Sequence, residues 1–192
     1  MGGCLVLVAG ISGTGKTKLC EGIVKKWKPN VVHLNKDKTL AEYAKMKGTT
    51  AEEVLRDYKK ERKFVYDMYY RIAEEELEKG KTVLLDNPHV KELLHFPEWW
   101  ERINMLCERT KSRLVFIKCF IPDLREYRER LERRGLGRDR EKLRTSETFR
   151  KFLEYEPLNF KAPKGSLAVD TSRKVDFQKV IGFIERSKGI KL

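Results

Sequence analysis

One segment of eight residues constrains this chain more than any other: Gly10-Ile11-Ser12-Gly13-Thr14-Gly15-Lys16-Thr17. It matches the pattern G-x-x-x-x-G-K-[ST] at every position. An apolar run, 4–9, precedes it, and a helix-like stretch, 18–27, follows it. Strand, glycine-rich turn and helix form the context in which this pattern cradles phosphate groups. A simple turn would require neither Lys16 nor Thr17, so the sequence predicts a P-loop that binds ATP or GTP.

The P-loop pattern also assigns roles to individual side chains. Backbone N–H groups from Gly10 to Lys18 would surround the phosphates, and the start of the following helix presents its positive dipole end to the same anion. The Lys16 ammonium would reach the β- and γ-phosphates, and the Thr17 hydroxyl would hold Mg²⁺. The expected ligands are therefore ATP, as phosphoryl donor, and Mg²⁺.

A second apolar run, 82–85, ends in Asp86. A hydrophobic strand that ends in aspartate at the carboxyl edge of a parallel sheet is typical of the Walker B element of P-loop proteins. We therefore expect Asp86 to lie near Thr17 and to contribute to the metal site.

Asn35-Lys36-Asp37-Lys38 follows the short apolar run 31–34, again where ligands bind in open parallel sheets. The tetrapeptide is similar to the guanine-reading N-K-x-D motif of GTPases. Its Asp stands one place too early, however, and the segment lies close behind the P-loop instead of far downstream. We interpret this match as chance and expect ATP over GTP.

Arginine is concentrated between residues 125 and 144, around Gly135 and Gly137. The arginines are Arg125, Arg128, Arg130, Arg133, Arg134, Arg138, Arg140 and Arg144. Pairing with glutamates at helical spacing would explain some of them. The preference for Arg over Lys favours phosphate binding, because the guanidinium is a rigid fork suited to phosphate oxygens. We expect a mobile lid over about 125–148 that closes on the γ-phosphate.

The remaining pattern predicts one domain over 1–192, an α/β three-layer sandwich with a five-stranded parallel sheet. A capping box at Thr50–Glu53 opens a long helix to about residue 79, Pro97 suits a first helical position, and Gly135 ends the lid helix. A final strand ends in Asp170-Thr171, before a closing amphipathic helix over 175–186.

Bulk properties narrow the class further. The formal net charge of +13 favours anionic partners, and nucleic acid is one candidate. No apolar run approaches the length of a membrane helix and no signal peptide is evident, so we expect no membrane partner and a cytoplasmic location. Four scattered cysteines form no metal-binding pattern, and buried reduced thiols are the default expectation. A Cys4–Cys119 disulfide stays open, because the two residues lie in predicted strands that could be neighbours.

Taken together, these motifs resemble the P-loop kinases of the polynucleotide-kinase and zeta-toxin type, within the nucleoside-monophosphate-kinase-like group. The resemblance covers roughly the whole chain. It implies a kinase that transfers the γ-phosphoryl of Mg-ATP to a hydroxyl of a nucleic-acid, nucleoside, nucleotide or small-metabolite acceptor. In the 5′-hydroxyl kinases the pattern N-x-x-D follows the second strand, and Asn35-Lys36-Asp37 preserves part of it. The resemblance therefore implies Asp37 as the base and Arg130 or Arg133 as the lid arginine.

Three alternatives remain open. Asp86-Asn87-Pro88-His89 lacks the arginine that mononucleotide kinases carry after this strand, which disfavours a mononucleotide acceptor. A nucleotide-binding ATPase switch acting on a protein partner would share the P-loop but needs no acceptor. A nucleic-acid-binding module with a vestigial P-loop is disfavoured by the intact Lys16-Thr17 pair.

His89 and His95 are interpreted as bystanders, because phosphoryl transfer needs little from imidazole.

Overall fold

The computed structural model describes residues 2–27, 30–56 and 58–187, without the side chains of 55, 56, 58–60, 62 and 138. Five parallel strands form one sheet in the order β2-β3-β1-β4-β5. The strands are β1 (Cys4–Ala9), β2 (Val31–Asn35), β3 (Thr82–Asp86), β4 (Arg113–Phe120) and β5 (Leu167–Asp170). This is the α/β fold of P-loop NTPases, as the sequence predicts.

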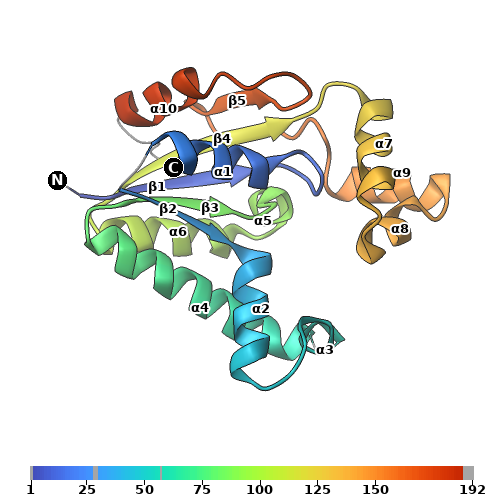
Figure 1. The fold of residues 1–192 in the computed structure, drawn as a ribbon, viewed down its shortest axis with the longest axis horizontal. Coiled ribbons are helices and arrows are strands. Elements are labelled where there is room, and N and C mark those ends of the chain that lie inside the picture. Colours follow the sequence, from blue (N-terminus) through green and yellow to red (C-terminus); the bar gives the residue numbers. More distant parts are fainter. Residues whose placement is uncertain (1, 28–29, 57, 188–192) are drawn as a thin grey trace.

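Ten helices are assigned within the described residues. They are α1 (Lys16–Lys26), α2 (Lys36–Met46), α3 (Ala51–Arg56), α4 (Tyr58–Glu78), α5 (Val90–His95), α6 (Pro97–Arg109), α7 (Leu124–Arg134), α8 (Gly137–Leu143), α9 (Ser146–Tyr155) and α10 (Phe177–Arg186). Helices α1 and α10 cover one face of the sheet, and α4 and α6 cover the other, which gives the three layers (Figure 1).

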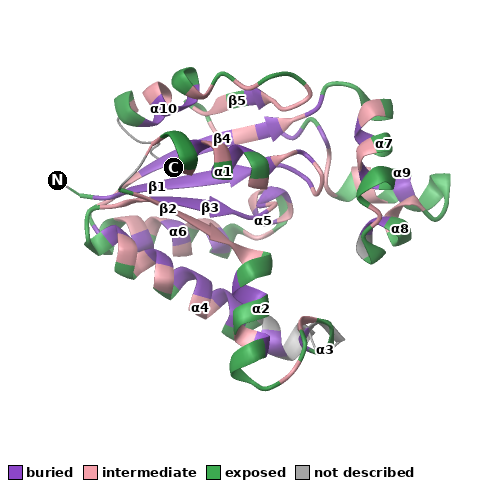
Figure 2. Cartoon of the chain, in the orientation of Figure 1, coloured by how far each residue is buried: buried purple, intermediate pink, exposed green. Residues whose placement is uncertain are grey.

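The central strand shows why the layers form. Every residue of β1 is buried, and successive side chains point to opposite faces. Val6 and Val8 pack with Ile23 of α1 and Ile181 of α10. Leu5, Leu7 and Ala9 belong to the cluster that includes α4 and α6. Figure 2 shows the buried residues along the sheet and on the inner sides of these helices.

Local signals fix several helix ends. The Thr50 hydroxyl accepts from the Glu53 N–H, and the Glu53 carboxylate accepts from the Thr50 N–H, so the predicted capping box is confirmed. Pro97 is the first residue of α6. Gly135 ends α7 in the left-handed conformation, with φ of 65°. Helices α3 and α4 cover the span of the predicted long helix, and residue 57 between them lies outside the described residues.

The arginine-rich region folds into three helices, α7, α8 and α9, grouped beyond the carboxyl ends of β1 and β4 (Figure 1). The sequence predicts α7 and suggests that Gly135 and Gly137 act as a hinge. In the structure Gly137 is the first residue of the helix α8. The Tyr127 hydroxyl donates to the Ser12 carbonyl at 2.7 Å and so ties α7 to the P-loop. The predicted mobility of this lid stays a prediction.

Two further expectations concern chemistry outside the site. All four cysteines are free thiols. Cys4 pairs in register with Arg113 at the start of β4, whereas Cys119 lies six residues further along that strand, so the Cys4–Cys119 disulfide that the sequence left open does not form and the default of reduced thiols holds. Among the described residues, no helix is both long and apolar enough to cross a membrane.

Candidate active site

The P-loop lies between β1 and α1 and requires positive φ angles at its glycines, 94° at Gly13 and 78° at Gly15. Lys16 is buried, and its ammonium donates to the carbonyls of Gly10 at 2.9 Å and Ile11 at 3.1 Å. Burial lowers the pKa of Lys16, and the nearby Asp86 carboxylate opposes that shift. The loop therefore already holds a compact cationic centre.

Asp86 lies beside Thr17, as the sequence predicts. The Thr17 hydroxyl donates to Asp86 Oδ2 at 2.7 Å, Asn35 Nδ2 donates to the same oxygen at 2.6 Å, and His33 Nε2 lies 3.1 Å from it. Burial acts to raise the pKa of Asp86, but the hydrogen bonds from His33, Thr17 and Asn35, together with the Lys16 charge, lower it on balance. The carboxylate is therefore ionised at neutral pH.

These atoms fit a divalent cation. Cys20, His33 and Asp86 offer ligand atoms that all lie within 4.8 Å of one another. Burial, with the Asp86 charge, raises the pKa of Cys20 well above its usual value, so its thiol stays protonated and is a poor ligand. The remaining oxygen donors, the Asp86 carboxylate and the Thr17 hydroxyl, are the hard ligands that Mg²⁺ prefers.

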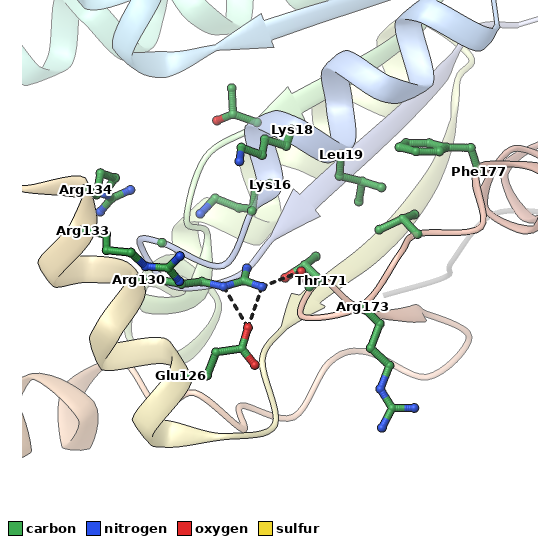
Figure 3. Close-up of a pocket in the computed structure, with 14 residues that line it drawn as sticks. Lys16, Lys18, Leu19, Glu126, Arg130, Arg133, Arg134, Thr171, Arg173 and Phe177 are labelled. Atoms are coloured by element: carbon green, nitrogen blue, oxygen red, sulfur yellow. Dashed lines mark hydrogen bonds and ion pairs between the residues drawn. The ribbon is translucent and has the colours of Figure 1, made fainter.

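A large pocket of about 870 Å³ opens on one side of the P-loop. Its lining includes Lys16, Thr17 and Lys18 from the P-loop side, Val175 from the segment before α10, and Phe177, the first residue of α10. Figure 3 shows this arrangement, with Leu19 and Phe177 opposite the lid arginines. Its volume lies within the range of sites that bury a nucleotide-sized ligand, about 300–1,000 Å³.

Three arginines of α7 reach from the lid toward the P-loop (Figure 3). Arg130 donates to Glu126 Oε1 at 2.8 Å and to the Thr171 carbonyl at 2.9 Å. Arg133 is exposed and forms one long hydrogen bond, 3.5 Å, to a backbone carbonyl of its own helix. Both line the large pocket, where the sequence expects them.

Arg134 differs from its neighbours. Its Nε and Nη2 donate to the two carboxylate oxygens of Asp139 at 2.6 and 2.7 Å, and Nη2 also donates to the Ser12 hydroxyl at 2.8 Å. The Asp139 side chain is completely buried. Arg134 is also the lid arginine that lines both pockets. The Arg138 side chain lies outside the described residues.

A smaller pocket of about 240 Å³ lies on the other side of the P-loop. It shares Gly13, Lys16, Thr17 and Arg134 with the large pocket. Its other lining residues are Ser12, Asn35, Lys36, Asp37, Asp86, Asn87, Pro88, Lys91, Lys142 and Glu156. The structure thus brings Asp37 to the second pocket, next to the P-loop.

His89 and His95, the two histidines that the sequence analysis interprets as bystanders, line neither pocket. His89 is fully buried, packs against Trp99 with the two rings tilted by 32°, and adopts a left-handed conformation with φ of 56°. Burial lowers the pKa of His89 to about 4, so its ring is neutral at physiological pH. His95 Nε2 lies 3.0 Å from the Tyr155 carbonyl and connects α5 to the end of α9. Both therefore have structural contacts.

Residues 5–158 match the family model described as an AAA domain, AAA_33. The chain belongs to this AAA-domain family. No curated protein sequence matches the chain significantly.

Solved structures share the AAA-domain chain's fold at low sequence identity. A proposed kinase from Chloroflexus aurantiacus j-10-fl is 19% identical with a TM-score of 0.67, and the match covers 96% of this chain and 94% of that one. The Mycobacterium tuberculosis APS kinase CysC, solved with AMPPNP and APS, is 17% identical with a TM-score of 0.57, over 96% and 98% of the two chains. These matches establish the fold.

Sequence reasoning missed several site residues. Asn35 and Asp86 end neighbouring strands in register, so their contact follows from the pairing of β2 with β3. His33 lies two residues before Asn35 and shares its face, a period-2 signal present in the sequence. Nothing in the sequence distinguishes Arg134 from Arg133, because only the position of Asp139 separates their roles.

Proposed function

We propose that this protein is a kinase that transfers the γ-phosphoryl group of Mg-ATP to a hydroxyl of an acceptor bound in the smaller pocket. The observation that carries the proposal is the pair of pockets meeting at Lys16, Thr17 and Arg134. A donor in the large pocket and an acceptor in the small one would approach each other at this junction. The AAA-domain family and its P-loop fold support nucleotide binding at the same place.

In this proposal the P-loop amides and Lys16 hold the triphosphate, while Thr17 and Asp86 are the residues that would hold Mg²⁺. The bound ion would neutralise charge on the phosphates. Asn35 and His33 orient the Asp86 carboxylate through the hydrogen bonds described above. Val175, Phe177 and Leu19 offer an apolar surface to the base of ATP.

The reaction then proceeds by in-line transfer. Asp37 accepts the proton of the acceptor hydroxyl, the oxygen bonds the γ-phosphorus, and the bond to the β-phosphate oxygen breaks as ADP leaves. Arg134 stabilises the charge on the moving phosphoryl group. Its Nε–Nη2 edge is bonded to Asp139, which fixes the plane of the guanidinium and leaves Nη1 on the opposite edge. Arg130 and Arg133 line the donor pocket and are proposed to contact ATP.

The polynucleotide-kinase and zeta-toxin type is the finer family assignment that we propose, on the strength of Asp37, and it leaves the class of the acceptor open. The rival function is a nucleotide-binding ATPase switch with a protein partner. A switch needs no second pocket beside its P-loop, and no carboxylate such as Asp37 in it. The smaller pocket therefore favours the kinase.

The test is ADP release from Mg-ATP, alone and with a panel of nucleosides, mononucleotides, 5′-hydroxyl oligonucleotides, tRNA and small hydroxyl compounds. We expect stimulation by one class of acceptor, lowered about a hundredfold to ten-thousandfold in Asp37→Asn, because the variant cannot accept the proton. Glu42→Gln is the matched control, since Glu42 is an exposed carboxylate on the same helix. Slow hydrolysis that no compound stimulates would favour the switch instead.

A further inference from the structure

The smaller pocket has a lining that restricts what its acceptor can be. Beside the parts shared with the donor pocket, it presents three lysines, Lys36, Lys91 and Lys142, and three carboxylates, Asp37, Asp86 and Glu156. Pro88 is its one apolar side chain, and no aromatic ring belongs to the described lining. Proteins that bind a nucleobase in single-stranded or splayed form stack it on aromatic side chains or Arg planes. This pocket offers no aromatic platform among its described residues.

Size points the same way. At about 240 Å³ the pocket is smaller than the range of about 300–1,000 Å³ that is usual for ligand sites. The neighbouring donor pocket, at about 870 Å³, is large enough for a nucleotide. A compact acceptor therefore fits the smaller pocket better than a nucleoside does.

The lysines differ in how they are held. Lys142 Nζ lies 4.2 Å from the centre of the Phe152 ring, and Lys36 Nζ lies 5.9 Å from that of Tyr66. These contacts place each ammonium group beside an aromatic ring at the wall of the pocket. Lys91 is half-buried at the start of α5 and forms no ion pair within the described part of the chain. A half-buried cation of this kind is suited to an anionic ligand.

Asn87 adds a buried polar group to the lining of the pocket. It is almost completely buried, its Nδ2 donates to the Tyr66 hydroxyl at 3.4 Å, and its Oδ1 has no hydrogen-bond partner among the described residues. A buried amide oxygen without a partner is unfavourable unless a ligand or water donates to it. A hydroxyl group is such a donor.

We propose that the acceptor is a compact hydroxyl compound that carries an anionic group, a phosphate or a carboxylate, which Lys91 binds. This inference rests on the kinase function proposed above. Lys36 and Lys142 add positive charge around the anion, and Asn87 and Asp37 hold the hydroxyl side of the molecule. The hydroxyl proton goes to Asp37, the new O–P bond forms at the γ-phosphorus, and ADP departs.

The first test compares pairs of acceptors of which only one member carries an anionic group: ribose 5-phosphate with ribose, and glycerate with glycerol. Adenosine and a 5′-hydroxyl oligonucleotide complete the panel. We expect kcat/KM to be at least about tenfold higher for the charged member of a pair, in line with a charge-assisted hydrogen bond. The phosphate and carboxylate pairs identify which anion is preferred. Preference for adenosine or the oligonucleotide overturns the inference and leaves the kinase proposal intact.

The second test uses the Lys91→Met variant. We expect it to remove the preference for the charged acceptor, chiefly by raising KM about tenfold to a hundredfold, while a general folding defect would lower activity on both members equally. Lys45→Met is the matched control, because Lys45 is an exposed lysine of α2 outside both pockets. Equal losses on charged and uncharged acceptors contradict the proposed role of Lys91.

The third test needs no turnover. With the P-loop filled by Mg-AMPPNP, calorimetric titration with inorganic phosphate should show saturable binding that Lys91→Met weakens about tenfold or more. Phosphate binding without stimulation by any acceptor would reject the kinase proposal and retain the anion site. Absence of saturable phosphate binding, or equal binding by the variant, overturns the anion site.

Discussion

The Arg134–Asp139 pair gives the sharpest test of the lid. In Arg134→Met the completely buried Asp139 carboxylate loses its cation. Removal of one partner of a buried pair costs about 3–5 kcal/mol. We expect the lower end, about 3 kcal/mol, because the Arg134 side chain is 32% exposed and water can partly solvate the carboxylate.

Catalysis and stability can be separated by a second substitution. In Arg134→Met/Asp139→Leu no charge is left buried, so the free energy of unfolding should return to within about 1 kcal/mol of the wild-type value. Turnover should not return. A lid arginine is worth about a thousandfold or more in kcat, which corresponds to about 4 kcal/mol, and both variants lack it.

Urea unfolding and acceptor-stimulated ADP release measure the two quantities on the same samples. Arg125→Met is the control, because Arg125 is an exposed arginine of the same helix that lines neither pocket. We expect it to lose less than about tenfold in kcat. A double variant with wild-type turnover, or an Arg125→Met loss as large as that of Arg134→Met, would refute the assignment of Arg134.

Two predictions concern stability. The pKa of His89 is about 4 in the folded chain, against an ordinary value of 6.5. As pH falls, the unfolded chain therefore takes up this proton before the folded chain does. The free energy of unfolding should fall by about 3 kcal/mol between pH 6.5 and 4. His89→Asn, which tolerates the same backbone conformation, should flatten urea-derived stability between pH 7.5 and 5, and an unchanged slope would contradict this cause. Gly10→Ala places a Cβ 2.5 Å from the Cys119 carbonyl oxygen at a residue with φ of 154°. We expect the free energy of unfolding to fall by about 3 kcal/mol, which thermal unfolding would show as a lower midpoint. Gly48→Ala, with φ of 66° and no atom within 4 Å of its Cβ, should lose only about 1 kcal/mol, and similar midpoints for the two variants would rule out the steric argument.

Local patterns were sufficient for the framework. The P-loop, the apolar strands, the capping box at Thr50 and the Gly135 terminus depend on residues close together in the chain. Asp86 could be predicted because any parallel strand ending in Asp beside β1 brings its carboxylate to the P-loop, and β3 is that neighbour. The fold class and the five-stranded parallel sheet predicted from these patterns agree with the structure.

Other features depend on contacts between distant segments. The hydrogen bonds of Asn35 and His33 to Asp86 require β2 to pair with β3, which no local pattern specifies. The helix α8 follows Gly135 and Gly137, which read locally as a hinge, and it carries Asp139 beneath Arg134. The absence of a Cys4–Cys119 disulfide follows from the register of β1 against β4.

The sequence alone thus determined that the chain folds around a P-loop and that cations gather on one helix, because motif spacing and helix caps act over a few residues. The tertiary structure decided which of the lid arginines lines both pockets. Arg130, Arg133 and Arg134 lie within about one helical turn and are chemically identical, so only the surrounding charges distinguish them. A buried carboxylate five residues further along the chain orients Arg134, and its burial exists only once α8 has packed.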